Sequence, residues 1–168
     1  AVWIGSNGVV TVNVVKGTGN VTIKVNDKEY VVELNENGTA TKEIPAEDLV
    51  VGENVVTATY ESAEYLPASD STLLVVIDGV VTQDNYMYYF NQEDNGKLFD
   101  YVPDGATLDF QGSIINLDQK IIVQMNVNKP VNIISSTGDA YVDLNTTAGS
   151  LLGESPGNSF AITYGGSG

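Results

Sequence analysis

Three residue types that carry much of protein chemistry are absent from this chain of 168 residues. It has no cysteine and no histidine, and all 7 of its basic residues are lysines. Without cysteine there are no disulfides and no thiolate metal sites, and without histidine there is neither a Ser-His-Asp relay nor the usual zinc site. Without arginine there is no bidentate clamp for a phosphate group. Carboxylate pairs are the catalytic arrangement that remains open.

Positive charge is also scarce, because 22 acidic residues stand against the 7 lysines and the net charge is −15. Nucleic acids and anionic lipid surfaces are bound chiefly through lysine and arginine, so we expect no nucleic-acid partner. No apolar run reaches the length of a membrane-spanning helix, so we expect no membrane insertion. The 42% of hydrophobic residues suffices for a packed core, and the strong charge favours solubility.

Apolar and polar residues alternate along most of the first 78 residues, which is typical of half-buried strands. The alternating runs cover residues 10–15, 21–26, 30–34, 39–44, 56–60 and 72–77. Asn26-Asp27 and Asn37-Gly38 separate consecutive runs and suit tight turns, because Asn, Asp and Gly tolerate positive φ. So many short strands predict a β-sandwich over residues 9–77. The side chains expected in its core are Val12, Ile23, Val32, Val56 and Tyr60.

The end of this stretch resembles a known family. Residues 51–54 read Val-Gly-Glu-Asn, and residues 60–69 read Tyr-Glu-Ser-Ala-Glu-Tyr-Leu-Pro-Ala-Ser. Both segments are similar to the penultimate-strand region of bacterial and archaeal Ig-like repeats, although Ser62-Ala63 stands where that family usually has Gly-Asp. The resemblance implies an Ig-like β-sandwich domain over residues 1–78. For Tyr60 and Tyr65 we expect core and corner packing rather than ligand binding.

The pattern changes after Asp78-Gly79. From Thr82 to Asn91 the aromatic residues recur at helical spacing, with Thr82 as a candidate N-cap, so we expect a short amphipathic helix that covers a core. Corners bearing Gly, Pro or Asn follow at intervals. The strands expected between them run from 107 to 110, 120 to 125, 131 to 134, 140 to 144 and 159 to 164. Their succession fits the opening coils of a parallel β-helix.

This second half resembles the start of the β-helical region in large adhesin-like proteins of methanogenic archaea. The resemblance rests on Asp-Gly-Ala-Thr-Leu-Asp-Phe-Gln-Gly at 104–112 and on the segments 126–134, 140–144 and 160–168. In that family a helix with Tyr-Phe-Asn, here residues 89–91, precedes them. The resemblance implies a domain over residues 79–168 made of a capping helix and the first β-helix coils. It also implies an archaeal, extracellular location at the cell surface and a role in adhesion.

Few residues qualify as candidate sites. Asn20, Asn37 and Asn145 each begin an Asn-x-Thr sequon and are candidates for N-glycosylation. Asp100, Asp104 and Asp109 cluster near a turn, which leaves a bound cation as an alternative. Because no EF-hand-like loop or Gly-Gly-x-Gly-x-Asp repeat accompanies them, we expect no metal. We also expect no cofactor and no catalytic residue.

The favoured function is therefore that of an extracellular, non-catalytic adhesin or stalk module. Its expected partners are other cell-surface or host molecules, or copies of itself. One alternative is a subunit of an extracellular filament, in which the apolar Val2, Trp3 and Ile4 of one copy pair with another copy by strand addition. The acceptor edge in that hypothesis is an uncharged strand that contains Phe160, Ile162 and Tyr164. A second alternative is a fragment of a β-helical enzyme that acts on glycans.

Overall fold

The computed structural model describes residues 1–62, 66–89, 101–116, 123–127, 130–143 and 160–164. The chain is mostly β, and the helical segments among the described residues are short, which confirms the all-β class. Its residues form two compact units, Ala1–Asp78 and Gly79–Gly168. The two units therefore divide where the sequence pattern changes.

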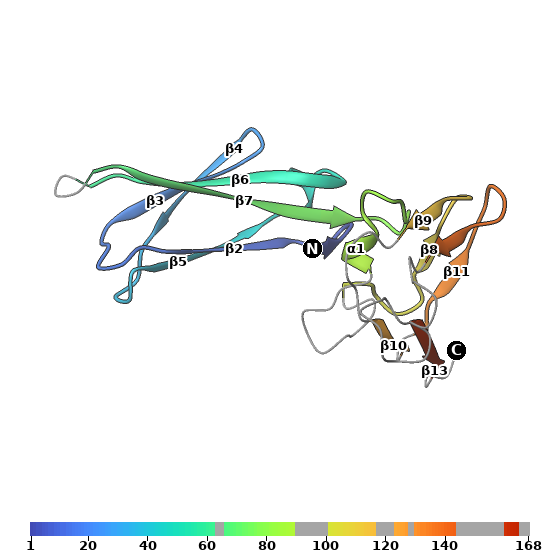
Figure 1. Ribbon diagram of the computed structural model, residues 1–168. Coiled ribbons are helices and arrows are strands. Elements are labelled where there is room, and N and C mark those ends of the chain that lie inside the picture. The colour runs from blue at the N-terminus through green and yellow to red at the C-terminus, as the bar shows by residue number, and fades with distance from the viewer. Residues whose placement is uncertain (63–65, 90–100, 117–122, 128–129, 144–159, 165–168) are drawn as a thin grey trace. The chain divides into compact units, whose positions relative to one another are not determined.

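Unit 1 (Ala1–Asp78) consists of two sheets (Figure 1). Its elements are β1 (Val2–Trp3), β2 (Gly8–Asn13), β3 (Asn20–Val25), β4 (Lys28–Glu33), β5 (Thr39–Ile44), the 3-10 helix η1 (Ala46–Asp48), β6 (Gly52–Tyr60) and β7 (Ala68–Ile77). The larger sheet has five strands in the order β1-β7-β6-β3-β4, and the smaller one pairs β2 with β5. All pairs are antiparallel except β1 with β7, which is parallel.

One hydrophobic core joins the two sheets of unit 1. The five-stranded sheet contributes the inward residues of β3 and β6, and the smaller sheet contributes those of β2 and β5. The buried members are Val10, Val21, Ile23, Val25, Leu34, Ala40, Ile44, Val56 and Tyr60. They follow the period of two that the sequence shows, because successive side chains of a strand point to opposite faces.

The core expectation holds for three residues and is wrong for two. Ile23, Val56 and Tyr60 are buried, whereas Val12 and Val32 are only half-buried against the cluster. Val12 lies on β2 and Val32 on β4, and each of these strands has one neighbour only. Alternation predicts only which face a side chain occupies; Val10 of the same strand β2 is buried, so the extent of burial depends on what covers each point of that face.

The two expected turns lie where they were placed. Asn26 has a φ of 51° between β3 and β4, and Gly38 has a φ of 73° just before β5. A Cβ at Gly38 would collide with the carbonyl oxygen of Val14, so this turn requires glycine for space as well as for its backbone angle. Tyr60 does pack at a corner: its hydroxyl donates to the Thr18 carbonyl at 2.9 Å and accepts from the Thr18 N–H at 3.2 Å.

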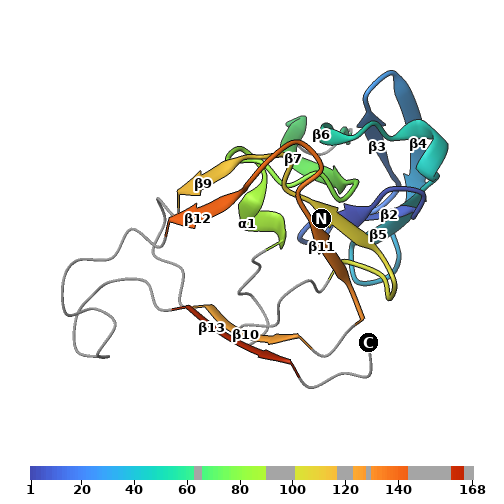
Figure 2. The ribbon, with the colours of Figure 1, turned by 90° about the vertical axis from the view of Figure 1, so that its right-hand side faces the viewer.

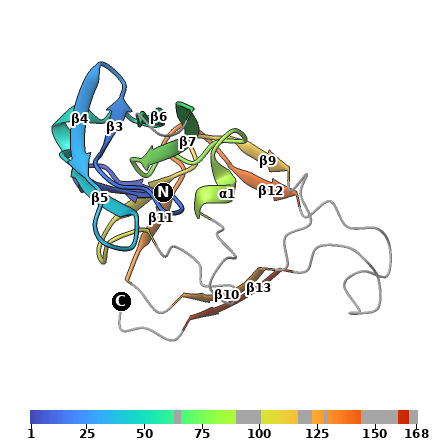
Figure 3. The ribbon, with the colours of Figure 1, turned by 90° about the vertical axis from the view of Figure 1, so that its left-hand side faces the viewer.

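The described residues of unit 2 (Gly79–Gly168) form α1 (Tyr86–Tyr89) and six short strands. The strands are β8 (Thr107–Asp109), β9 (Ile114–Asn116), β10 (Val123–Val127), β11 (Asn132–Ile134), β12 (Tyr141–Asp143) and β13 (Phe160–Tyr164). Each of the first three pairs in parallel with the strand three places later, so the pairs are β8–β11, β9–β12 and β10–β13. Figures 2 and 3 show β10 beside β13 and β9 beside β12. The sequence did not predict β9, which is short and begins directly after the turn at Gly112.

The helix expected from Thr82 begins later in the structure. Residues 82–85 form a turn, and α1 starts at Tyr86. The Asn85 side chain lies across this turn: its oxygen accepts from the Thr82 N–H at 2.8 Å, and its nitrogen donates to the Val80 carbonyl at 2.8 Å. The Thr82 carbonyl still accepts the first helical bond, from the Tyr86 N–H at 2.9 Å. Residues 90 and 91 of the expected helix lie outside the described residues.

The aromatic residues of α1 do cover a core. Tyr86 and Tyr89 are fully buried, together with Leu108 of β8 and Ile115 of β9. The Tyr89 hydroxyl accepts the Gly79 N–H at 2.9 Å, which ties the helix to the first residue of unit 2.

Candidate functional site

The predicted strand donor is already paired within its own unit. Val2 lies opposite Val76 and Trp3 opposite Ile77 in the parallel β1–β7 pair. The ladder continues one residue further, because the Ile4 N–H donates to the Ile77 carbonyl at 2.8 Å. Val2 and Trp3 are half-buried, and Ile4 is 48% exposed. Pairing of these residues with another copy thus requires that they leave β7.

The predicted acceptor residues Phe160, Ile162 and Tyr164 lie on β13. They pair in register with Val123, Met125 and Val127 of β10, which occupy one edge of β13. On the other edge, none of the described residues forms a strand pair with β13. The structure therefore does not bring the candidate donor and acceptor segments together, and it leaves one acceptor edge unpaired within the described part of the chain.

The strands β11 and β12 show the same one-sided pairing as β13, again among the described residues. Apolar side chains accompany them: Ile133 is 55% exposed and Tyr141 is 59% exposed. A hollow of about 680 Å³ lies between these strands, lined in part by Phe110, Ile134 and Val142. This apolar surface, with open strand edges beside it, can bind another strand or another layer of strands.

Two corners of unit 2 are held together by the carboxylate of Asp109. It accepts hydrogen bonds from the Ser136 hydroxyl at 2.6 Å, from the Ser136 N–H at 3.0 Å and from the Gln111 N–H at 2.9 Å. The Ser136 hydroxyl, followed by these backbone N–H groups, holds the pKa of Asp109 below its usual range, while partial burial acts in the opposite direction. Asp109 is thus a link between two layers of strands, since β8 ends at Asp109 and β11 ends just before Ser135.

Sequence reasoning treated Asp109 as one acid of a cluster and missed Ser136. The corner at 109–112 and the corner at 135–138 both end in glycine, but nothing in the sequence pairs the two corners. Gly112 has a φ of 67°, and a Cβ there would lie 2.8 Å from the Thr137 carbonyl oxygen. The two corners therefore approach so closely that glycine is needed.

Two of the three sequons lie on the surface. Asn20 begins β3 and Asn37 lies in the turn before β5, and both side chains are exposed. Asn37 donates its backbone N–H to the Asn35 side chain at 2.9 Å, which leaves the sequon on the outside of the turn. Asn145 lies outside the described residues.

The described part of the chain holds no group of three or more Asp or Glu side chains that could bind a metal ion together. Asp104 and Asp109 belong to that part, whereas Asp100 does not. Among the helices described, none is long and apolar enough to cross a membrane. The candidate functional features of this chain are thus strand edges, apolar strand faces and exposed sequons.

Comparison with known proteins does not add a family to these features. No protein-family model, no curated protein and no solved structure matches the chain.

Proposed function

We propose that the chain is an extracellular, non-catalytic module of a cell-surface adhesin or stalk. In this proposal unit 1 is an Ig-like β-sandwich, and unit 2 is a capping helix followed by the first coils of a parallel β-helix. The role is to hold and present a binding surface at a distance from the cell, toward host or neighbouring cell-surface molecules.

The observation that carries the proposal is the parallel pairing in unit 2. Thr107 lies opposite Asn132, Ile114 opposite Tyr141 and Val123 opposite Phe160. The strands β8, β9 and β10 form one turn of a coil, and β11, β12 and β13 form the next turn. Each strand of the second turn pairs with the corresponding strand of the first, so the two turns stack. Stacks of this kind grow in one dimension, since each layer contacts only its neighbours, and they serve as rods and as extended binding surfaces.

The parallel pairing of β1 with β7 in unit 1 also suits a protein under tension. Because these strands are parallel, a pull on Ala1 and an opposite pull at Asp78 shear the β1–β7 ladder. Shear loads the hydrogen bonds of that ladder together, including the one from Ile4 to Ile77 at 2.8 Å. Simultaneous loading resists force better than bonds that break one after another.

Location is tested by surface labelling of intact cells that make the protein. We expect a membrane-impermeant amine reagent to label this protein, whose 7 basic residues are all lysines, to the same extent in intact and in lysed cells. Labelling only after lysis would contradict the extracellular location. A cytoplasmic protein measured in the same samples serves as the control for leakage.

The mechanical role is tested by single-molecule stretching of the full chain. Ile4→Pro removes the N–H that bonds to Ile77, so we expect a lower peak force for the opening of unit 1. Glu36→Pro is the matched control. Glu36 is the second residue of a turn that is closed by the hydrogen bond from the Gly38 N–H to the Asn35 carbonyl at 3.0 Å, and the second position of such a turn accepts proline. Equal peak forces for the two variants would contradict the proposal that the β1–β7 ladder resists force.

A second candidate is a filament subunit, which the unpaired edge of β13 favours. In this candidate Val2, Trp3 and Ile4 of one copy leave β7 and pair with residues 160–164 of the next copy. We expect the full chain to form filaments visible by electron microscopy, and a peptide of residues 1–8 to cap their growth. A chain that stays monomeric at high concentration contradicts the filament but not the stalk.

A further inference from the structure

The strand edges of unit 1 differ in how well charges protect them. The edge strand β4 carries Lys28, Glu29 and Glu33, and β5 carries Lys42 and Glu43. The edge strand β2, with the sequence Gly-Val-Val-Thr-Val-Asn, has no charge at all. β7 is covered by β1 only at Val76 and Ile77, and its remaining edge carries a single charge, Asp70. Natural sheets usually place charges on edges that must not pair, so the β2 and β7 edges are the exception in unit 1.

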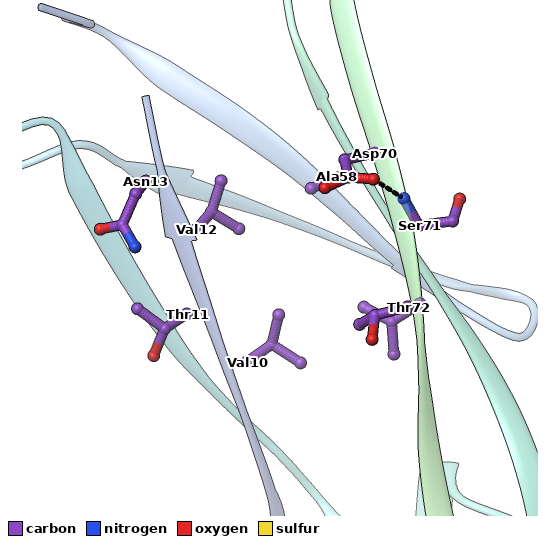
Figure 4. A pocket seen from close by; sticks show the side chains of 9 residues that line it. Val10, Thr11, Val12, Asn13, Ala58, Asp70, Ser71 and Thr72 are labelled. Atoms are coloured by element: carbon purple, nitrogen blue, oxygen red, sulfur yellow. Dashed lines mark hydrogen bonds between the residues drawn. The ribbon is translucent and has the colours of Figure 1, made fainter. Parts of the chain in front are cut away.

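A groove runs between these two edges (Figure 4). It has a volume of about 330 Å³ and lies between residues 10–13 of β2 and residues 70–72 of β7, with Val56 and Ala58 of β6 behind them. Val10 and Val12 point across it, while Thr11 and Asn13 point away. A smaller hollow of about 120 Å³ shares Val12, Ala58 and Asp70 with the groove and continues it toward Ala68.

Burial along β7 shows that the groove is a stretch of uncovered core. Leu74, Thr72 and Asp70 lie opposite Asn54, Val56 and Ala58 of β6, and therefore face the same side of the sheet. Leu74 is half-buried, and Thr72 and Asp70 are exposed. The closed end is at Leu74, where the side chain lies so near to β2 that a Cβ on Gly8 would collide with it. Beyond this point the inner face of β7 has no covering strand among the described residues.

Charge determines which occupant suits the groove. Among the described residues that line the two hollows, Asp70 is the only charged one. In the bonds described, its carboxylate accepts only the N–H of its neighbour Ser71, at 2.9 Å. A carboxylate on the inner face of an edge strand repels an occupant that is acidic and attracts one that carries a cation. A second copy of this chain, with a net charge of −15, is therefore disfavoured.

We propose that this groove binds an extended segment of a partner polypeptide, which adds to the edge of β7 in line with β1. The segment carries apolar side chains at alternate positions, toward Val10 and Val12, and a lysine or arginine where it faces Asp70. Backbone hydrogen bonds to the edge provide affinity, and the pockets for alternate side chains provide specificity. The site is separate from the strand edges of unit 2, so it does not depend on the adhesive role proposed above.

The probes are two capped synthetic peptides of alternating valine and threonine, identical except for one inward position that is lysine in the first and glutamate in the second. We expect the lysine peptide to shift the amide resonances of residues 9–13 and 68–74 in the full chain. We expect it to bind about two- to fivefold more tightly than the glutamate peptide, the range of one partly exposed ion pair. This preference is measured on the unaltered protein, so it does not depend on any variant.

Two variants then test whether the preference for the lysine peptide depends on Asp70. Asp70→Lys should reverse the order of the two peptides, whereas Glu29→Lys makes the same change of charge on the β4 edge and should leave the order unchanged. Both side chains are exposed, and the fluorescence of Trp3 checks that unit 1 stays folded. The proposal is overturned if neither peptide binds at millimolar concentration, or if Asp70→Lys has no effect on their order. It is also overturned if Asp70→Asn pairs with itself into dimers while the peptides stay unbound, because the groove would then be an interface between copies.

Discussion

We expect Asn54→Ala to destabilise unit 1 by about 3–5 kcal/mol, because it removes a buried side chain that bonds to three parts of the unit. Asn54 lies on β6 and is fully buried. Its oxygen accepts from the Val50 N–H at 2.9 Å and from the Asn26 side chain at 2.8 Å. Its nitrogen donates to the carbonyls of Val50 at 2.8 Å, Gly52 at 3.2 Å and Leu74 at 3.1 Å.

The magnitude follows from what each partner loses. The Val50 N–H is partly buried and has one acceptor in this network, so leaving it unpaired costs about 1–3 kcal/mol. The carbonyls keep a second lone pair, and the Asn26 amide also reaches the Asp48 carbonyl at 3.3 Å, so these bonds together contribute about 2 kcal/mol. A unit of this size has a free energy of unfolding of about 4–12 kcal/mol, so the loss is a large fraction of it.

Urea unfolding of the full chain, followed by fluorescence, isolates this effect, because the single tryptophan, Trp3, lies in unit 1. Asn7→Ala is the matched control: Asn7 is exposed, and its side chain bonds to Glu43 at 2.7 Å and to the Ala46 N–H at 2.9 Å. We expect the control to cost less than about 1 kcal/mol, because water replaces the lost bonds. If Asn54→Ala shifts the urea midpoint no more than Asn7→Ala does, the reasoning about the buried network is refuted.

Three further predictions concern the turn, the corner link and metal. Gly38→Ala should destabilise unit 1 by more than about 2 kcal/mol, because φ is positive there and the new Cβ collides with a backbone carbonyl, whereas Gly19→Ala, with φ positive but open space, should cost about 1 kcal/mol in the same urea assay. The Ser136 hydroxyl lowers the pKa of Asp109 in the folded state. The bond between Asp109 and Ser136 should therefore stabilise the fold above the ordinary carboxyl pKa, and this stabilisation should be lost as the pH falls through the lowered pKa of Asp109. Near-ultraviolet circular dichroism during acid titration should therefore show that the wild type is more stable than Asp109→Asn at neutral pH and that this difference in stability disappears as the pH falls. A difference in stability that is the same at all pH values speaks against the link. EDTA should leave the melting temperature nearly unchanged, and a fall of many degrees would reveal a structural cation.

Much of the local structure was readable from the sequence. The runs with a period of two became β2 to β7, and the turns at Asn26 and Gly38 lie at their expected places. These features depend on a few adjacent residues, namely alternate apolar side chains and residues that tolerate positive φ. The exceptions are also local: α1 begins at Tyr86, later than expected, and β9 was too short for a periodic signal.

The candidate sites were less predictable, because they depend on which strands become neighbours. The sequence identified Val2 to Ile4 as apolar but did not indicate that β7 binds them in parallel. It identified Asp109 as acidic but gave no sign that Ser136 lies beside it. Both contacts join residues that are far apart along the chain, and one sequence carries no direct signal for such pairs.

The sequence by itself determined the all-β class, the places of most strands and turns, the change of pattern after Asp78 and the strong negative charge. Only the tertiary structure decided that Asn54 is a buried anchor, that β1 leaves the edge of β7 uncovered at residues 68–75, and that Asp70 is the one charge among the described residues beside the groove. The physical reason is that a period of two fixes which face of a sheet a side chain occupies. Whether that face is then covered depends on strands that are distant in the chain, and their pairing is settled only when the whole unit folds.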